Sequence, residues 1–137
     1  MGVGCKNKYL PLNELEVYKL SRELSGLSWA VYNEMDWRIK KNIGDQFIRS
    51  ADSVGANIAE GYGRYHYLDK IRFYYNARAS LFESCNHWLE LLKERNLIEG
   101  TKYVQIHLIG KDLLVKLNNF IKTTYEQKYG RNTIEIQ

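Results

Sequence analysis

A single proline, Pro11, is the feature that most restricts how this chain of 137 residues can fold. Proline ends or kinks a helix, because its ring fixes φ and removes a backbone donor. From Leu12 to Gln137 the sequence contains no proline, so helices several turns long can form anywhere in that stretch. That stretch shows no strict alternation of apolar and polar residues, which would favour strands over helices. The sequence therefore predicts an all-α fold.

Four stretches of the chain carry apolar residues every three or four positions, which is the spacing of one helix face. The first predicts a helix over about 13–34, with Asn13 as its cap. The second helix begins as early as Asp36 and ends near Gly61. The fourth follows Thr101, its expected cap, while the third is described below.

Glycines are expected to mark the helix ends. Gly61 and Gly63 are predicted to supply the positive φ that closes the second helix, and Gly100 to break the chain before the fourth. Short connections between long helices favour antiparallel neighbours. We therefore predict an antiparallel up-down-up-down four-helix bundle, a single domain over 1–137 with an ordered core over about 12–126 and flexible termini.

The third helix carries two apolar stripes, although a surface helix needs only one. The second stripe, Tyr75, Phe82 and Leu89, has seven-residue spacing, and we predict that it forms an oligomer interface. The alternative is that it widens the contact with the core. The first stripe consists of Ile71, Tyr74, Leu81, Cys85, Trp88 and Leu92.

The second helix also carries a ridge of small residues. Ala51, Gly55 and Ala59 recur every four positions. Such a ridge lets another backbone approach closely, because little side chain stands in the way. That backbone belongs either to the same bundle or to another subunit.

Residues that could perform chemistry are scattered. His66, His87 and His107 lie 21 and 20 positions apart, without the close ligand pairs typical of metal sites. Cys5 and Cys85 cannot form a disulfide framework, which favours a reducing, cytoplasmic setting. No stretch approaches the ~20 apolar residues of a membrane span. We predict no metal, no cofactor, no catalytic residue and no membrane association, and hence a protein that is not an enzyme.

The net charge of +4 is concentrated in one third of the chain. Residues 37–80 hold eight bases and four acids, whereas the remaining residues hold 12 of each sign. Within that third, tyrosines alternate with Arg64 and His66, as in surfaces on which unpaired bases stack. The alternative is that these tyrosines fold back and cap the end of the bundle.

The run 46–64 reads QFIRSADSVGANIAEGYGR. It resembles the signature of the bacterial four-helix bundle proteins, also called 23S rRNA intervening-sequence proteins. The resemblance covers about residues 12–126, and it departs from the family pattern at Arg78 and Ala79, where glycine is common at the second position. The matching positions are Arg49, Ser53, Val54, Asn57, Ile58, Ala59, Glu60, Gly61, Gly63, Arg64, Phe73, Ala77, Ser80, Leu81 and Glu83.

The resemblance implies a bundle that assembles as a homopentamer and has no enzymatic activity. Some members of the family are encoded within insertions in large-subunit ribosomal RNA genes. The family is similar to accessory proteins of diversity-generating retroelements, which bind nucleic acid and a reverse transcriptase. We therefore expect an oligomer that contacts RNA, DNA or a ribonucleoprotein, with an assembly or adaptor module as the alternative. The expected phosphate contacts are Arg64, Lys70, Arg72, Lys40 and Lys41, with Tyr65 and Tyr67 as stacking platforms.

Glu60 stands at the end of a helix where a carboxylate is disfavoured. A guanidinium would compensate it, and Arg64, Arg49, Arg72 and Arg78 are the candidates, from the same bundle or from a neighbour. We predict a structural role for Glu60, with Asn57 satisfying backbone groups near the turn. The expected structural residues of the motif are Arg49, Ser53, Asn57, Glu60, Gly61, Gly63 and Glu83.

Overall fold

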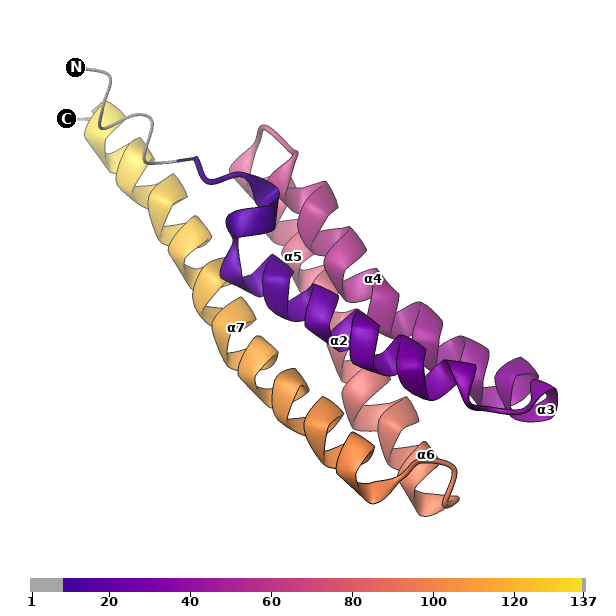
Figure 1. The fold of residues 1–137 in the computed structure, drawn as a ribbon. Helices are drawn as coiled ribbons and strands as arrows, with labels where there is room; N and C mark the ends of the chain where they lie inside the picture. The colour runs from indigo at the N-terminus through magenta and orange to yellow at the C-terminus, as the bar shows by residue number, and fades with distance from the viewer. Residues whose placement is uncertain (1–8, 137) are drawn as a thin grey trace.

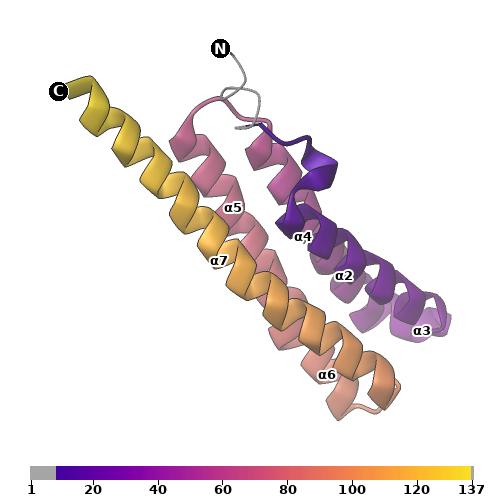
Figure 2. The same ribbon diagram turned by 60° about the vertical axis from the view of Figure 1, so that its left-hand side comes forward.

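A computed structural model describes the backbone of residues 9–136 and the side chains of residues 9–127. This part of the chain is all-α and contains no strand. It forms four long helical rods that lie side by side (Figures 1 and 2). The all-α prediction is confirmed, whereas most of the predicted N-terminal tail lies outside the described residues.

The first rod begins later than predicted. A short 3-10 turn, Leu12–Glu14, precedes α2, which spans Glu16–Asn33. Asn13 lies inside that turn and therefore does not cap the helix. The N-cap position of α2 is Leu15, which makes no side-chain capping bond. The prediction for Asn13 is wrong.

The second rod is continuous through three segments: α3 (Trp37–Ile39), a π-helical segment (Lys40–Gly44) and α4 (Asp45–Tyr62). Asp36 caps its start, because its carboxylate accepts hydrogen bonds from the backbone N–H groups of residues 38 and 39 at 2.9 and 3.1 Å. The predicted start is confirmed. The predicted positive φ is wrong, since no glycine in the described part has one, and Gly63 follows α4 with φ −80°.

The third rod comprises α5 (Tyr67–Leu81), a π-helical segment (Phe82–Trp88) and α6 (Leu89–Glu94). A π-helix places more residues in each turn than an α-helix, so the buried stripe advances by about four residues there. Leu89 is completely buried, and Trp88 is only partly buried. Placing Leu89 in an exposed interface stripe is therefore wrong, because the wider turns rotate it into the core.

The fourth rod is α7, which spans Gly100–Ile136 and continues beyond the predicted end of the core. Thr101 lies within this helix, and its hydroxyl donates to the carboxylate of Glu99, so the predicted cap is wrong. Gly100, which was predicted to break the chain before this helix, is its first residue. Asn96, with φ 55°, adopts the left-handed conformation between α6 and α7. Among the described residues, no helix combines the length and apolarity that crossing a bilayer requires.

The rods pack in a ring, with α2 against α4 and α7, and α5 against the same two helices. This arrangement is compatible with the predicted up-down order. The ridge of small residues serves packing inside the chain, because a Cβ on Gly55 would lie 2.8 Å from the Ser21 hydroxyl of α2. Ala51, in the same ridge, is completely buried.

Candidate nucleic-acid interface

One half of the signature motif joins α4 to α5. The Asn57 amide donates to the Ser53 carbonyl and hydroxyl at 2.9 and 3.0 Å. The Ser80 hydroxyl on α5 donates to the same Ser53 hydroxyl at 3.1 Å. Asn57 thus bonds within α4, one turn before the helix end, so its predicted role at the turn is wrong. It orients the serine through which the two helices touch.

Gly61 allows the closest approach of α4 and α5. A Cβ built on Gly61 would lie 2.7 Å from the Tyr74 ring and 2.9 Å from the Phe73 Cβ. The Tyr74 side chain is 1% exposed and cannot move away. Gly63 differs, since its Cβ would make only ordinary contacts, the nearest at 3.6 Å from the Ala59 carbonyl. The motif therefore needs Gly61 for packing within the chain, but not Gly63.

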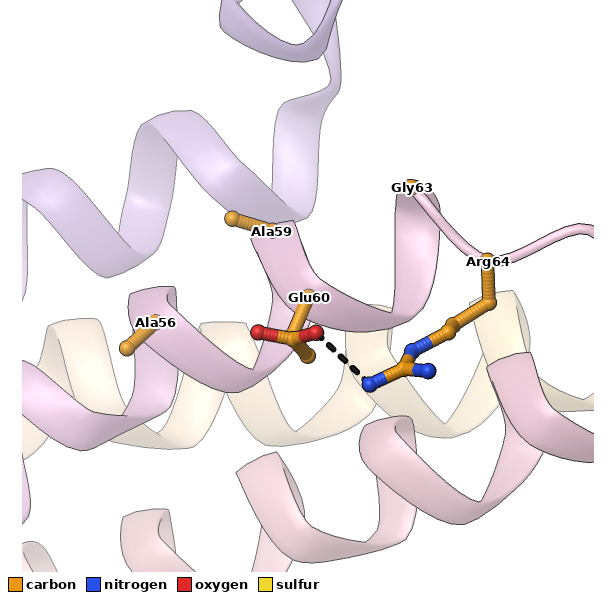
Figure 3. Close-up of a pocket in the computed structure, with 5 residues that line it drawn as sticks. All are labelled: Ala56, Ala59, Glu60, Gly63 and Arg64. Atoms are coloured by element: carbon orange, nitrogen blue, oxygen red, sulfur yellow. Dashed lines mark hydrogen bonds and ion pairs between the residues drawn. The ribbon is translucent and has the colours of Figure 1, made fainter.

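The other half of the motif faces solvent. The Glu60 carboxylate and Arg64 guanidinium point toward one another across a shallow pocket on α4, 2.8 Å apart (Figure 3). The side chains are 53% and 43% exposed. An exposed pair of this kind contributes about 0–1 kcal/mol, so it offsets the unfavourable helix end without holding the fold together. Ala56, Ala59 and Gly63 line the rest of the pocket.

The exposed arginines continue onto α5. The guanidinium carbons of Arg64 and Arg72 lie 4.8 and 5.4 Å from the centroid of the Phe73 ring. Tyr65 follows Arg64 in the chain and is 82% exposed, while Tyr67 is partly buried. We call Arg64, Tyr65, Arg72 and Phe73 the turn surface, because they surround the connection between α4 and α5.

Tyr62 follows the alternative interpretation, in which tyrosines cap the end of the bundle. Its hydroxyl donates to the Leu10 carbonyl at 2.5 Å, and its ring packs 5.9 Å from Tyr9. Tyr62 therefore belongs to the cap, whereas Tyr65 is presented to solvent. Capping therefore accounts for Tyr62, and stacking on Tyr65 stays a prediction.

Lys70 is not a surface cation. It is 7% exposed, and its ammonium donates to the Tyr62 carbonyl at 2.9 Å. The same ammonium lies 5.3 and 6.0 Å from the ring centroids of Tyr62 and Tyr9. Burial lowers the pKa of Lys70. The prediction that Lys70 contacts phosphate is wrong, because its ammonium is buried and donates to a backbone carbonyl at the end of α4.

Substitution of Lys70 should affect stability more than substitution of an exposed arginine does. We expect Lys70→Gln to lower the free energy of unfolding by about 1–3 kcal/mol, because the Tyr62 carbonyl loses a charged donor. Arg64→Gln should change stability by less than about 1 kcal/mol, since its ion pair is exposed. Urea unfolding of both variants checks this difference. Equal midpoints for the two variants would contradict the assignment of Lys70 to the core.

Lys40 and Lys41 lie at the opposite end of α4, next to α3 (Figure 1). Because α4 has 18 residues, the rise of a helix places the two ends about 27 Å apart. The structure therefore does not bring the predicted phosphate contacts together. It divides them between the turn surface and a second surface at the corner between α2 and α3.

The second surface contains aromatic residues that the sequence analysis did not select. Trp37 is 68% exposed and Trp29 is 53% exposed. Lys41 and Lys40 lie over the rings of Trp37 and Tyr32. Spacings of three and four residues, as in Trp29 with Tyr32 and Trp37 with Lys41, were the available signal. We call these five residues the corner surface.

The remaining predicted residues stay at or near the surface. Arg49 is exposed, and Glu83 accepts a hydrogen bond from the Trp88 indole at 2.9 Å. Tyr75 and Phe82 are 48% and 40% exposed. Leu68, seven positions before Tyr75, is also exposed. Leu68, Tyr75 and Phe82 are named the α5 stripe; they replace the predicted set that ended at Leu89.

The histidines pack against aromatic rings, and the described cysteine is buried. His66, His87 and His107 each pack against a neighbouring aromatic ring. Burial raises the pKa of the Cys85 thiol to about 11, so the reactive thiolate is disfavoured at neutral pH. Within residues 9–136, no three His, Cys, Asp or Glu side chains converge as metal ligands would. Cys5 lies outside the described residues.

Together these features define an all-α four-helix protein with exposed cations and aromatic rings at both ends of its second rod. The chain belongs to the 23S rRNA-intervening sequence protein family, whose model matches residues 13–119. It is also similar to the crystal structure of a protein of unknown function from the S23 ribosomal protein family of Bacteroides thetaiotaomicron. That similarity has 25% identity and a TM-score of 0.68, and covers 77% of this chain and 98% of the other. No curated protein matches the chain.

Proposed function

We propose that this protein is a non-enzymatic, cytoplasmic homo-oligomer that associates with nucleic acid, either RNA or a ribonucleoprotein. Each subunit would be an antiparallel up-down-up-down bundle. One observation carries the proposal: of the eight basic residues in the stretch 37–80, seven are at least partly exposed and only Lys70 is buried. The charge excess of that stretch is therefore displayed at the surface, where phosphates can reach it.

Assembly would strengthen such contacts. The family resemblance favours a pentamer, and five copies of a chain with net charge +4 would carry +20. Each further contact with one nucleic-acid molecule is then made at a high effective concentration. A reverse transcriptase or another protein of a ribonucleoprotein would be a partner if this chain shares the similarity to retroelement accessory proteins that the family resemblance implies.

Binding should depend strongly on salt. Each phosphate neutralised releases counterions, so raising salt from about 50 to 200 mM should weaken affinity about threefold for each contact. Arg64→Gln combined with Arg72→Gln should lower both the affinity and the slope of its salt dependence. Filter binding with single-stranded RNA and duplex DNA measures this, with Lys70→Gln as the control for a base that is buried.

A protein–protein adaptor is the second candidate, and the α5 stripe favours it. Leu68, Tyr75 and Phe82 expose apolar area at the seven-residue spacing of helix-to-helix contacts. In that case the cations would serve ion pairs between subunits. Failure of the protein to bind either nucleic acid at the lowest salt would favour this adaptor over the proposed function.

A further inference from the structure

We propose that the corner surface is a stacking site for unpaired bases of a single-stranded nucleic acid. This inference rests on the proposed function and assigns the binding of single-stranded nucleic acid to one surface of the fold. The indole of Trp37 would carry a base, with Lys40 and Lys41 meeting the flanking phosphates. Trp29, supported by Tyr32, would carry a second base.

The exposure of the two indoles is the first observation. Trp37 and Trp29 are 68% and 53% exposed, although tryptophan is usually buried through most of its large apolar area. The Trp29 ring stacks on Tyr32 with centroids 5.5 Å apart and planes 21° from parallel. The stack immobilises one ring and leaves indole area open to solvent. Flat faces of this kind accept a base without selecting its identity.

The charges around the rings are the second observation. The Lys41 ammonium lies 6.0 Å from the Trp37 centroid, and the Lys40 ammonium lies 5.1 Å from the Tyr32 centroid. Arg38, which follows Trp37 in α3, is also exposed. Cations next to open aromatic faces complement a ligand that is both flat and anionic. A nucleotide strand repeats that combination at every position.

Two acids of this region make hydrogen bonds within the chain. The Asp36 carboxylate accepts the backbone N–H groups at the start of α3. The Asp45 carboxylate accepts a hydrogen bond from the Tyr32 hydroxyl at 2.6 Å, which raises the pKa of Tyr32. Glu34 is also exposed, and it lines a small pocket together with Glu99. Residues 34–45 hold three acids and three bases, so the lysines placed beside the rings, and not a local excess of charge, supply the proposed phosphate contacts.

The corner is also held in place. Gly44 packs closely against Met35, since a Cβ there would lie 2.7 Å from the methionine sulfur. The Asn42 amide donates to the Arg38 carbonyl at 3.0 Å and links the π-helical segment to α3. The Met35 contact holds the connection between α2 and α3, and the Asn42 bond holds the start of the second rod, so the backbone of the site need not be ordered when a strand binds.

A single strand fits these observations better than a duplex. Base pairing and stacking hide the faces of bases inside a double helix, so its outer surface offers mainly phosphates. The lysines could meet those phosphates, but the indoles would gain nothing. A single strand offers free faces and phosphates together.

Tryptophan fluorescence tests the proposal directly, because the chain has three tryptophans and two belong to the corner. Trp88→Phe removes the third, whose indole bonds to Glu83 in the third rod. In this background we expect an oligouridylate of about 16 nucleotides to quench the emission. A duplex RNA of equal length should leave most of it unchanged.

Substitutions then locate the effect. Trp37→Ala in the same background should weaken oligouridylate affinity about 5- to 150-fold, the range for loss of one stacked base. Trp37→Phe should restore much of that loss, because it keeps a flat ring. Lys41→Gln should retain quenching but lower the affinity and reduce the slope of its salt dependence by about one. Circular dichroism confirms that each variant is folded.

Four outcomes would overturn the proposal. If Trp37→Ala binds the oligouridylate as tightly as its parent, stacking at the corner is wrong while the proposed function stands. If duplex RNA quenches as strongly as the single strand, the lysines alone explain binding. If anionic phosphatidylglycerol vesicles shift the emission and the oligouridylate cannot displace them, the corner contacts lipid. Absence of all nucleic-acid binding would remove the proposed function as well.

Discussion

Gly61→Ala should lower the free energy of unfolding by about 1–3 kcal/mol, the usual cost of adding atoms to a close-packed site. The added Cβ would lie within 2.9 Å of both Phe73 and Tyr74. Tyr74 is completely enclosed, and its ring also packs 4.8 Å from Phe120 of α7. To relieve the contact, α4 and α5 must move apart, which disturbs packing along the whole pair. The helix preference of alanine, worth up to about 1 kcal/mol, offsets only part of this cost.

Gly63→Ala is the matched control for this prediction. It lies two residues away, at φ −80°, and its Cβ would have room beside Ala59. Alanine there should be neutral or should stabilise the fold by up to about 1 kcal/mol, since it restricts the unfolded chain. Guanidinium unfolding of both variants at equal protein concentration measures the difference. A Gly61→Ala variant as stable as Gly63→Ala would show that the two helices do not approach as closely as described.

Leu89→Ala should cost about 2–5 kcal/mol, because it removes a fully buried side chain and leaves a cavity. Leu89 is completely buried at the start of α6, immediately after the π-helical segment. Leu81 and Leu92, on the buried face of the same rod, are equally enclosed, so few atoms can move into the cavity. Thermal unfolding followed by circular dichroism should show a large drop in the midpoint.

Phe82→Ala is the control on the same helical rod, seven positions earlier. Phe82 is 40% exposed, so its loss should change the stability of a single subunit by less than about 1 kcal/mol. If the α5 stripe is an interface, as we propose, Phe82→Glu should reduce the oligomer mass measured by light scattering without unfolding the subunit. Comparable destabilisation by Leu89→Ala and Phe82→Ala would contradict the division between core and stripe.

Much of the candidate site was accessible from residue types and spacing alone. The pairing of Glu60 with Arg64 was one of the predicted alternatives, and its four-residue spacing on a helix made it geometrically simple. The basic excess near Lys41 and Arg72 was also visible in the sequence. Lys70 could not be assigned correctly, because nothing local distinguishes a lysine that bonds a carbonyl across a turn from one in solvent.

The all-α class and the start of the second rod could be predicted from the amino-acid sequence, because proline content, apolar period and the Asp36 cap act within a few residues of chain. Which glycine is indispensable, and which leucine is buried, depended on how the helices pack. Gly61 matters through a neighbouring helix, and Leu89 turns inward because the π-helical segment before it shifts the face that the third rod packs against the core. Both depend on contacts between distant parts of the chain, and one helix examined alone carries no record of its neighbours.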